Sequence, residues 1–185
     1  MDDQGSSPHS YAMSRLWIKT NRLLLRRWRD DDVEPFAAMC SDPEVMRYIG
    51  SGATRTREQA QASIKAYERD WDENGYGLCA VELLDDGGFL GFTGLSEPSF
   101  LPEVMPAVEI GWRFARQSWG KGYASEAAHA VLEYGLNDLG LSEIICIYQA
   151  ENHASERIMQ KLGMFLARET IDPTCGRLIR VYRTP

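Results

Sequence analysis

A glycine-rich turn is the segment whose residue types point most directly to chemistry. Gly120 and Gly122 lie between an apolar run that ends at Phe114 and a helical pattern that begins near Ala124. Glycines let a backbone approach a ligand closely, and the free N–H groups at the start of a helix attract anions. The turn therefore predicts a site for a phosphate-bearing ligand, with a tight structural turn as the alternative.

Positive charge gathers at this turn in a chain that is acidic overall. Arg113, Arg116 and Lys121 lie within or beside the turn, whereas the 185-residue chain has a formal net charge of −7 and a pI near 5.0. Proteins that bind the nucleic-acid backbone need a dense basic face, so the composition argues against nucleic acid as a partner. The balance favours a small anionic ligand at the turn and an amine-bearing substrate elsewhere.

Two familiar phosphate-binding motifs do not fit this turn. A P-loop requires a serine or threonine directly after the lysine, where Gly122 stands. A dinucleotide fingerprint requires a glycine in place of Ser125 and a parallel strand-helix-strand unit. A nucleotide-binding module is therefore the least favoured interpretation.

Two blocks of sequence carry a family resemblance. The first runs Glu109-Ile110-Gly111-Trp112-Arg113-Phe114, then Gln117-x-x-Gly120-x-Gly122-Tyr123-Ala124-x-Glu126-Ala127. It resembles the acetyl-CoA signature of the GCN5-related N-acetyltransferase (GNAT) superfamily. The second, Asn152-x-x-Ser155 followed by Lys161-Leu162-Gly163-Met164, is similar to the RimJ/RimL-type branch of ribosomal-protein N-terminal acetyltransferases. Both blocks occur in the family's order, and the resemblance covers all but the first 14 residues.

The resemblance implies the fold and the cofactor. The expected fold is mixed α/β (α+β), with a mostly antiparallel sheet of about seven strands, splayed between the fourth and fifth, and about four flanking helices. Acetyl-CoA is the expected cofactor, with its pantetheine arm in the gap between the parted strands. The expected activity is transfer of the acetyl group to a primary amine, on a protein N-terminus or a small molecule, by direct attack in a ternary complex.

The resemblance also assigns cofactor contacts. The strand backbone is expected to pair with the pantetheine amides, the turn to hold the pyrophosphate through its backbone N–H groups, and Asn152 to contact the pantetheine or cap its helix. The strand residues are Ile110, Gly111, Trp112, Arg113 and Phe114, and the turn residues are Arg116, Gln117, Ser118, Trp119, Gly120, Lys121, Gly122, Tyr123 and Ala124. Tyr123 at the helix start also suits simple core packing.

Aminolysis of a thioester requires a neutral amine. A nearby carboxylate usually takes the proton from an amine that is charged. Glu109 is the candidate base, and a solvated glutamate at a strand end is the equal alternative. Many GNAT enzymes have a thiol-protonating tyrosine where this sequence has Met159. The branch resembled here points to Ser155 as the proton donor instead, against the alternative that Ser155 caps its helix. Tyr48 and residues 100–106 are expected walls of the substrate site.

A second function, of a non-catalytic class, is also compatible with the sequence. A non-catalytic acyl-CoA-binding or regulatory domain would keep the glycine turn and lose turnover, and the missing tyrosine favours it. His129 and His153 have no clustered partners, so no metal site is expected.

Periodic apolar patterns and turn residues predict the elements that position these groups. The chain opens strand, helix, helix, continues as a meander, and ends in strand, helix and hairpin. The expected strands cover 22–28, 77–84, 89–95, 107–114, 143–148, 164–170 and 178–183, and the expected helices 30–40, 56–74, 124–139 and 152–162. The third helix has a buried stripe made mostly of alanine, which lets it lie close to a sheet.

Composition and length predict one domain over residues 15–185, preceded by a loose arm over residues 1–14. The four cysteines form no Cys-x-x-Cys pair, which favours reduced thiols. No apolar stretch is long enough to span a membrane and no secretory signal is evident, so we expect a cytoplasmic protein without a membrane partner. Either a monomer or a homodimer is compatible with the sequence.

Overall fold

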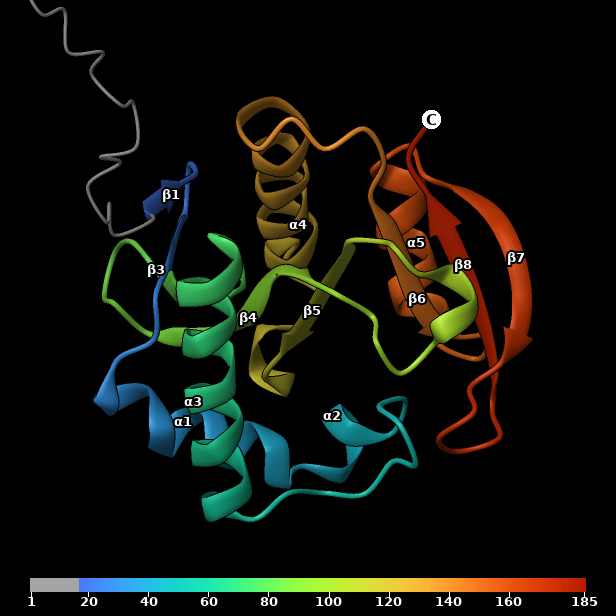
Figure 1. The fold of residues 1–185 in the computed structure, drawn as a ribbon. Coiled ribbons are helices and arrows are strands. Elements are labelled where there is room, and N and C mark those ends of the chain that lie inside the picture. The colour runs from blue at the N-terminus through green and yellow to red at the C-terminus, as the bar shows by residue number, and fades with distance from the viewer. Residues whose placement is uncertain (1–16) are drawn as a thin grey trace, which may run out of the picture.

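An eight-stranded sheet organises the chain in the computed structural model, which describes residues 17–185. The strand order is β1-β2-β3-β4-β5-β6-β8-β7, and Figure 1 shows helices on both faces. Neighbouring strands are antiparallel except for β5 and β6, which run parallel. The expected mixed, mostly antiparallel sheet is confirmed. The arm expected over residues 1–14 lies outside the described residues.

The elements follow the predicted order, with one extra strand and one extra helix. The strands are β1 (Trp17–Lys19), β2 (Leu23–Arg26), β3 (Leu78–Leu83), β4 (Phe89–Ser96), β5 (Glu109–Phe114), β6 (Ile145–Gln149), β7 (Phe165–Ile171) and β8 (Leu178–Arg183). The helices are α1 (Val33–Ser41), α2 (Pro43–Met46), α3 (Arg57–Asn74), α4 (Tyr123–Glu133) and α5 (His153–Lys161).

The two additions, β1 and α2, are short. Pro43 marks the end of α1 as expected, but it also occupies the first turn of α2, where a proline loses no helical hydrogen bond. Asp42 caps that turn by accepting a hydrogen bond from the Glu44 N–H at 2.9 Å. A four-residue helix carries too few apolar positions for its periodicity to be visible in the sequence.

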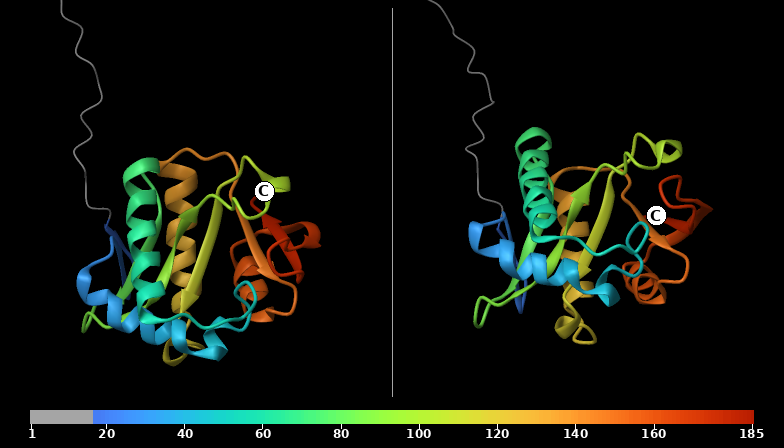
Figure 2. Two further views of the ribbon diagram at one scale, coloured as in Figure 1. Left: turned by 60° about the horizontal axis from the view of Figure 1, so that its bottom comes forward. Right: turned by 90° about the horizontal axis from the view of Figure 1, so that it is seen from below.

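The parallel strands β5 and β6 part almost as soon as they meet. Glu109 and Ile145 form the single paired register, and the Ile145 N–H donates to the Val108 carbonyl at 2.9 Å. Beyond that point the two strands diverge, as the views in Figure 2 show. The splay is confirmed, and it falls between the fifth and sixth strands because β1 adds one to the count.

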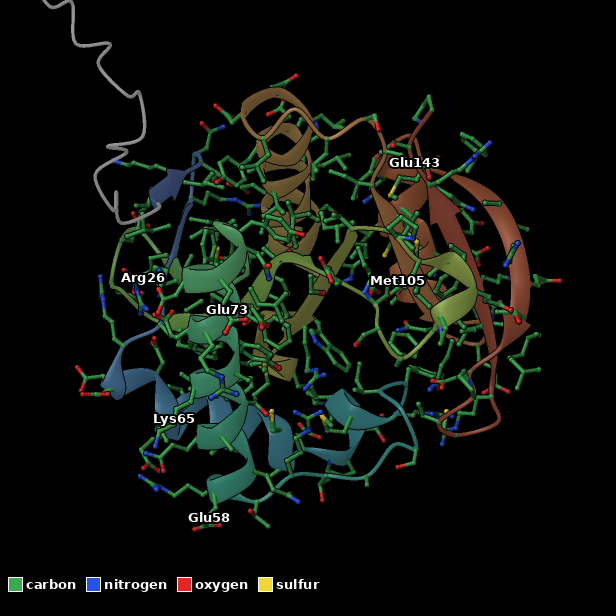
Figure 3. All side chains as sticks on the ribbon, in the orientation of Figure 1. Arg26, Glu58, Lys65, Glu73, Met105 and Glu143 are labelled. Atoms are coloured by element: carbon green, nitrogen blue, oxygen red, sulfur yellow. The ribbon has the colours of Figure 1, made fainter. Side chains whose placement is uncertain are left out.

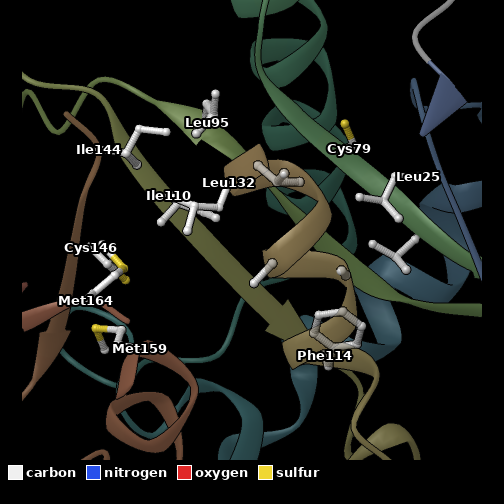
Figure 4. Close-up of a cluster of buried hydrophobic side chains, with 14 of the residues drawn as sticks. Leu25, Cys79, Leu95, Ile110, Phe114, Leu132, Ile144, Cys146, Met159 and Met164 are labelled. Carbon is white, nitrogen blue, oxygen red and sulfur yellow. The ribbon is translucent and has the colours of Figure 1, made fainter. Parts of the chain in front are cut away.

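Helices cover the sheet in two layers. The first, α1 to α3, packs on the face of the N-terminal half of the sheet around Phe36, Ile64 and Phe92. The second, α4 and α5, packs on the opposite face, and Figure 4 shows part of that core, including Ile110 and Phe114. The predicted alanine stripe is confirmed, because the side chains of α4 that contact the sheet most closely are those of fully buried alanines, Ala127 and Ala128.

Local signals fix the ends of α3 and the state of the thiols. A capping box begins α3, with reciprocal hydrogen bonds between Thr56 and Gln59. All four cysteines are free, and three of them are buried: Cys40, Cys79 and Cys146. None of the helices within residues 17–185 combines the length and apolar character needed to cross a bilayer.

A buried ion network ties the start of α1 to the sheet. The Arg26 guanidinium, labelled in Figure 3, donates to both carboxylate oxygens of Asp32 at 2.7 and 2.8 Å and to Glu82 at 2.6 Å. Asp32 also accepts from the Arg29 N–H at 2.8 Å. Arg26, Asp32 and Glu82 are all less than 9% exposed. Breaking such a network leaves a buried charge without its partner.

The substitution Asp32→Ala should therefore lower the free energy of unfolding by about 3–5 kcal/mol. Urea denaturation followed by circular dichroism measures this change. The matched control is Asp31→Ala, because Asp31 is the exposed neighbour and a surface change of this kind costs roughly 0.5 kcal/mol or less. Equal losses for the two variants would contradict a stabilising role for the network.

Candidate active site

The glycine turn adopts a backbone that presents an open surface. Gly120 has φ +73° and Gly122 has φ +81°, a conformation that other residues rarely adopt. A Cβ placed at Gly120 would meet no atom within 4 Å, so the space above this residue is free. Gly122 is also the N-cap residue of α4, which places a helix N-terminus directly beside the opening.

The N–H groups of the turn divide into two sets. Those of Ser118 and Trp119 donate to the carbonyls of Ala115 and Arg116, at 2.8 and 3.1 Å, so they close the turn itself. Within the described chain, the N–H groups of residues 120–124 have no acceptor. An anion would therefore be held by the later part of the turn and the start of α4. The buried Ser118 hydroxyl also lacks a partner and lines the cleft.

Glu126 anchors the turn from behind. Its carboxylate accepts from the Thr20 hydroxyl at 2.6 Å and from the Arg22 backbone N–H and guanidinium at 3.0 and 2.7 Å. Arg22 in turn donates to the Lys121 carbonyl at 3.0 Å. Burial raises the pKa of Glu126, but the hydrogen bonds from Thr20 and Arg22 more than offset this, so the pKa lies below its usual value. The charged form is thus stabilised, and the turn is held in one conformation.

A cleft of about 390 Å³ opens beside the turn, bounded by α5 and by the segment that follows α2. The side chains of Arg116, Gln117 and Lys121 do not line it, and Ile110 is fully buried in the core. The predicted cofactor residues that do line it are Trp112, Arg113, Phe114, Ser118, Trp119, Gly120, Gly122, Tyr123, Ala124, Asn152 and Ser155.

Three basic residues at this cleft were missed in the sequence. Arg47, Arg157 and Lys161 line it, and no ion pair involving them is found within residues 17–185. Arg157 and Lys161 are four residues apart on α5 and therefore share a face, a spacing that the sequence displays. Arg47 comes from a distant segment, so no local pattern could place it here.

A second cavity of about 290 Å³ lies on the other side of the splay and meets the first. Glu109 and Gly111 line the second cavity only. Tyr48 and Phe100, two of the expected substrate-site walls, both line it. Six residues line both cavities and mark where they join: Tyr48, Ile49, Trp112, Arg113, Asn152 and Ser155.

Glu109 sits at the parting of the strands. Its carboxylate accepts a hydrogen bond from the Ile147 N–H of β6 at 3.3 Å, across the splay. Burial raises the pKa of Glu109 to about 8, and the hydrogen bond from Ile147 offsets only part of that rise. A carboxyl that titrates near neutral pH suits general acid-base chemistry better than an ordinary glutamate.

Asn152 and Ser155 have separate roles in the first turn of α5. Asn152 Oδ1 accepts from the Ser155 backbone N–H at 3.2 Å, so Asn152 caps the helix. Within residues 17–185 the Ser155 hydroxyl makes no hydrogen bond, and Ser155 lines both cavities. Met159, at the place of the missing tyrosine, is fully buried in the core (Figure 4). Ser155 is therefore the hydroxyl that this helix presents to the cleft.

The hydrogen bonds of Arg177 and Gln149, here called the clasp, hold the segment after α2 over the cavities. The sequence did not predict these contacts. Arg177 Nη1 donates to the Arg47 carbonyl and to Gln149 Oε1, both at 2.8 Å, and Nη2 donates to the Ser51 carbonyl at 2.7 Å. The Gln149 amide donates to the Gly50 carbonyl at 2.7 Å. Residues from β6, the β7–β8 loop and the α2–α3 segment meet here, so the clasp depends on contacts far apart in sequence.

Comparison with known proteins decides the family. The model of the acetyltransferase (GNAT) domain family matches residues 22–165. This chain belongs to the GNAT acetyltransferase family. It is 36% identical over 147 residues to the N-acetyltransferase YnaD of Bacillus subtilis, a match that covers 80% of this chain and 81% of that protein. The GNAT assignment predicted from the two sequence blocks is confirmed.

Solved GNAT structures share the fold. An acetyltransferase of Bacillus anthracis matches with a TM-score of 0.76 and 29% identity, over 91% of this chain and 98% of the other. The ribosomal L7/L12 alpha-N-protein acetyltransferase RimL, solved in complex with coenzyme A, matches with a TM-score of 0.74 and 12% identity, over 91% and 97% of the two chains. This GNAT protein is thus an acetyltransferase enzyme that uses acetyl-CoA, as expected.

Replacing Gly120 tests the open turn. Gly120→Leu would place a side chain in the free space above the N–H groups, so the affinity for coenzyme A should fall roughly 100-fold, as expected when about two charge-assisted hydrogen bonds are lost. Isothermal titration calorimetry measures the affinity. Gly140→Leu is the matched control, because Gly140 has a similar φ of +68° and equally free space but lies outside the cleft. An unchanged affinity in the Gly120 variant would contradict this site.

Proposed function

We propose that this enzyme transfers the acetyl group of acetyl-CoA to a primary amine by direct attack, with cofactor and acceptor entering from opposite sides of the splay. The observation that carries this proposal is the junction of the two cavities at Asn152 and Ser155. A thioester at that junction is within reach of an amine that comes from the Glu109 side. No covalent intermediate on the enzyme is required.

The cofactor occupies the first cavity in this proposal. The free N–H groups of residues 120–124 hold the pyrophosphate, and Arg47, Arg157 and Lys161 add positive charge at the mouth. The pantetheine arm lies along β5 beyond Glu109, where β6 has departed and the strand has an unpaired edge. Its amides then add to that edge like a short strand.

Two side chains carry the proton transfers. Glu109 in its carboxylate form accepts a proton from the ammonium of the acceptor, directly or through a water molecule, and the neutral amine then attacks the thioester carbonyl carbon. As the C–N bond forms and the C–S bond breaks, the Ser155 hydroxyl donates its proton to the leaving sulfur and regains one from the nitrogen of the new amide. These positions place the base on the acceptor side and the acid at the junction, so the two protons move at different ends of the reacting group.

The acceptor is a protein N-terminus or a small-molecule amine. Two similar proteins support this choice by their names: RimL is a ribosomal L7/L12 alpha-N-protein acetyltransferase, and a relative from Aspergillus fumigatus is an FsC-acetyl coenzyme A-N(2)-transacetylase. A thiol-release assay with a panel of amines tests the proposal. Acetyl-CoA-dependent release of thiol with at least one amine is the expected result, and tight binding of acetyl-CoA without release on any amine would overturn it.

Glu109 should set the pH dependence of the reaction. With an acceptor that is already neutral, such as a hydrazide, kcat/KM should rise with pH and level off above about pH 8, because only the carboxylate form acts as a base. Glu109→Gln should lower kcat/KM by roughly 10²- to 10⁴-fold and abolish this rise. Steady-state kinetics between pH 6 and pH 10 provide the measurement.

The control for Glu109 is Glu151→Gln, which removes an exposed carboxylate outside both cavities. Its pH profile should match that of the unmodified enzyme. If the Glu109 variant keeps an inflection near pH 8, the titrating group is another residue and the assignment of the base is wrong.

Ser155→Ala separates proton donation from helix capping. Because Asn152 supplies the cap, the midpoint of thermal unfolding should hardly change, whereas kcat should fall roughly 10²-fold through loss of the proton donor. Asn152→Ala is the comparison variant, since loss of a cap costs about 1 kcal/mol of stability. A Ser155 variant that loses stability and keeps full turnover would return this residue to a structural role.

A further inference from the structure

Arg113 is half-buried, and its charge is not paired by the part of the chain that the structure describes. Of the five N–H donors of its guanidinium, only one has a partner within residues 17–185, because Nη1 donates to Cys40 Sγ at 3.7 Å. The Nε atom is buried without a partner. No ion pair joins Arg113 to any carboxylate of the described chain, residues 17–185. A guanidinium N–H that is shielded from water normally has an acceptor, so Arg113 has unused capacity for an anion.

The surroundings of Arg113 compensate its charge only weakly. The guanidinium lies 5.2 Å from the centre of the Phe92 ring, a modest attraction. Burial lowers the pKa of Arg113. The nearby Tyr67 and Cys40 oppose that shift, and the positive charge of Arg55 adds to it. The charge of a second arginine, Arg55, acts on Arg113, which makes this corner more favourable for a negative group.

This corner borders the second cavity, which is the proposed acceptor cavity, and Arg113 also reaches the first cavity where the two join. Arg113, Phe92 and Tyr67 line the same cavity as Glu109. Glu109 and Arg113 are four residues apart on β5, so they share one face of the sheet, with roughly 13 Å between their Cα atoms. Their side chains diverge, since Glu109 reaches towards Ile147 of β6 and Arg113 lies over Phe92 of β4. The two side chains therefore leave β5 in different directions and line the second cavity at separate places.

We propose that the acceptor carries a carboxylate as well as its amine, and that Arg113 binds this carboxylate while the amine lies beside Glu109. This rests on the amine acetylation proposed above. Allowing about 3 Å for a hydrogen bond at each end, the amine and the carboxylate stand roughly 7 Å or more apart. That spacing fits an ω-amino acid or a short peptide, and it is too long for the two groups on the Cα atom of one amino acid.

The test compares acceptors that differ only in charge. With the enzyme and acetyl-CoA, kcat/KM for 6-aminohexanoate should exceed that for 6-aminohexanamide by roughly 10- to 100-fold, the effect of a charge-assisted hydrogen bond. Arg113→Met should abolish this preference, and Arg113→Lys should retain part of it. Arg69→Met, which removes an exposed charge from α3, should keep the full preference.

A binding measurement separates this inference from the catalytic proposal. Calorimetry with the coenzyme-A-bound enzyme should show that hexanoate binds roughly 10- to 100-fold more tightly than hexanamide, with the difference lost in Arg113→Met. If no amine is acetylated but this difference persists, the catalytic proposal fails and the carboxylate site stands. Equal binding of the two probes, or a preference that survives in Arg113→Met, overturns the carboxylate site whether or not amines are acetylated.

Discussion

Strands β5 and β6 pair at a single register, Glu109 with Ile145, and the candidate active site depends on the absence of further pairing. Parallel strands normally continue their ladder, because an unpaired backbone group away from water is costly. Here the β5 edge beyond Glu109 borders a cavity instead of a neighbouring strand. In the mode of cofactor binding proposed above, the amide groups of pantetheine complete that edge, so the same unmade hydrogen bonds that leave the opening would also bind the cofactor.

Beyond Glu109 and Ile145 no hydrogen-bond ladder joins β5 to β6, so other contacts must set the separation of these strands. On the β6 side, Leu101 from the β4–β5 connection packs on Ile145, Ile179 and Val181 and covers that half of the sheet. Across the opening, Arg177 fastens the segment after α2 through its hydrogen bonds to backbone carbonyls. The cavity walls are therefore fixed by loop packing and a polar clasp, while the helical layers fix the sheet itself. The opening is thus bounded by packed side chains and hydrogen bonds in place of a continuous ladder.

The sequence predicted those parts of the molecule whose causes are local. Capping residues, the glycine turn and the alanine stripe of α4 act over a few positions, and the structure has them where expected. The clasp of Arg177 and the approach of Arg47 to α5 join segments that are far apart in the chain, so no single window contains them. The sequence offered capping or proton donation for Ser155, and only the Asn152 hydrogen bond showed that the cap is made without its hydroxyl.

The electrostatics of the acceptor cavity reverse those of the whole protein. The chain carries a net charge of −7, yet Glu109, with its pKa raised to about 8, is mostly protonated at pH 7, while Arg113 keeps its positive charge. An entering ammonium changes this balance, because a cation beside a carboxyl lowers its pKa and favours release of its proton. In the mechanism proposed above, an arriving ammonium would therefore favour the carboxylate form of Glu109, which is the form that acts as a base. A carboxyl with a raised pKa thus avoids the cost of a permanently desolvated charge, and in this mechanism it ionises once its substrate is bound.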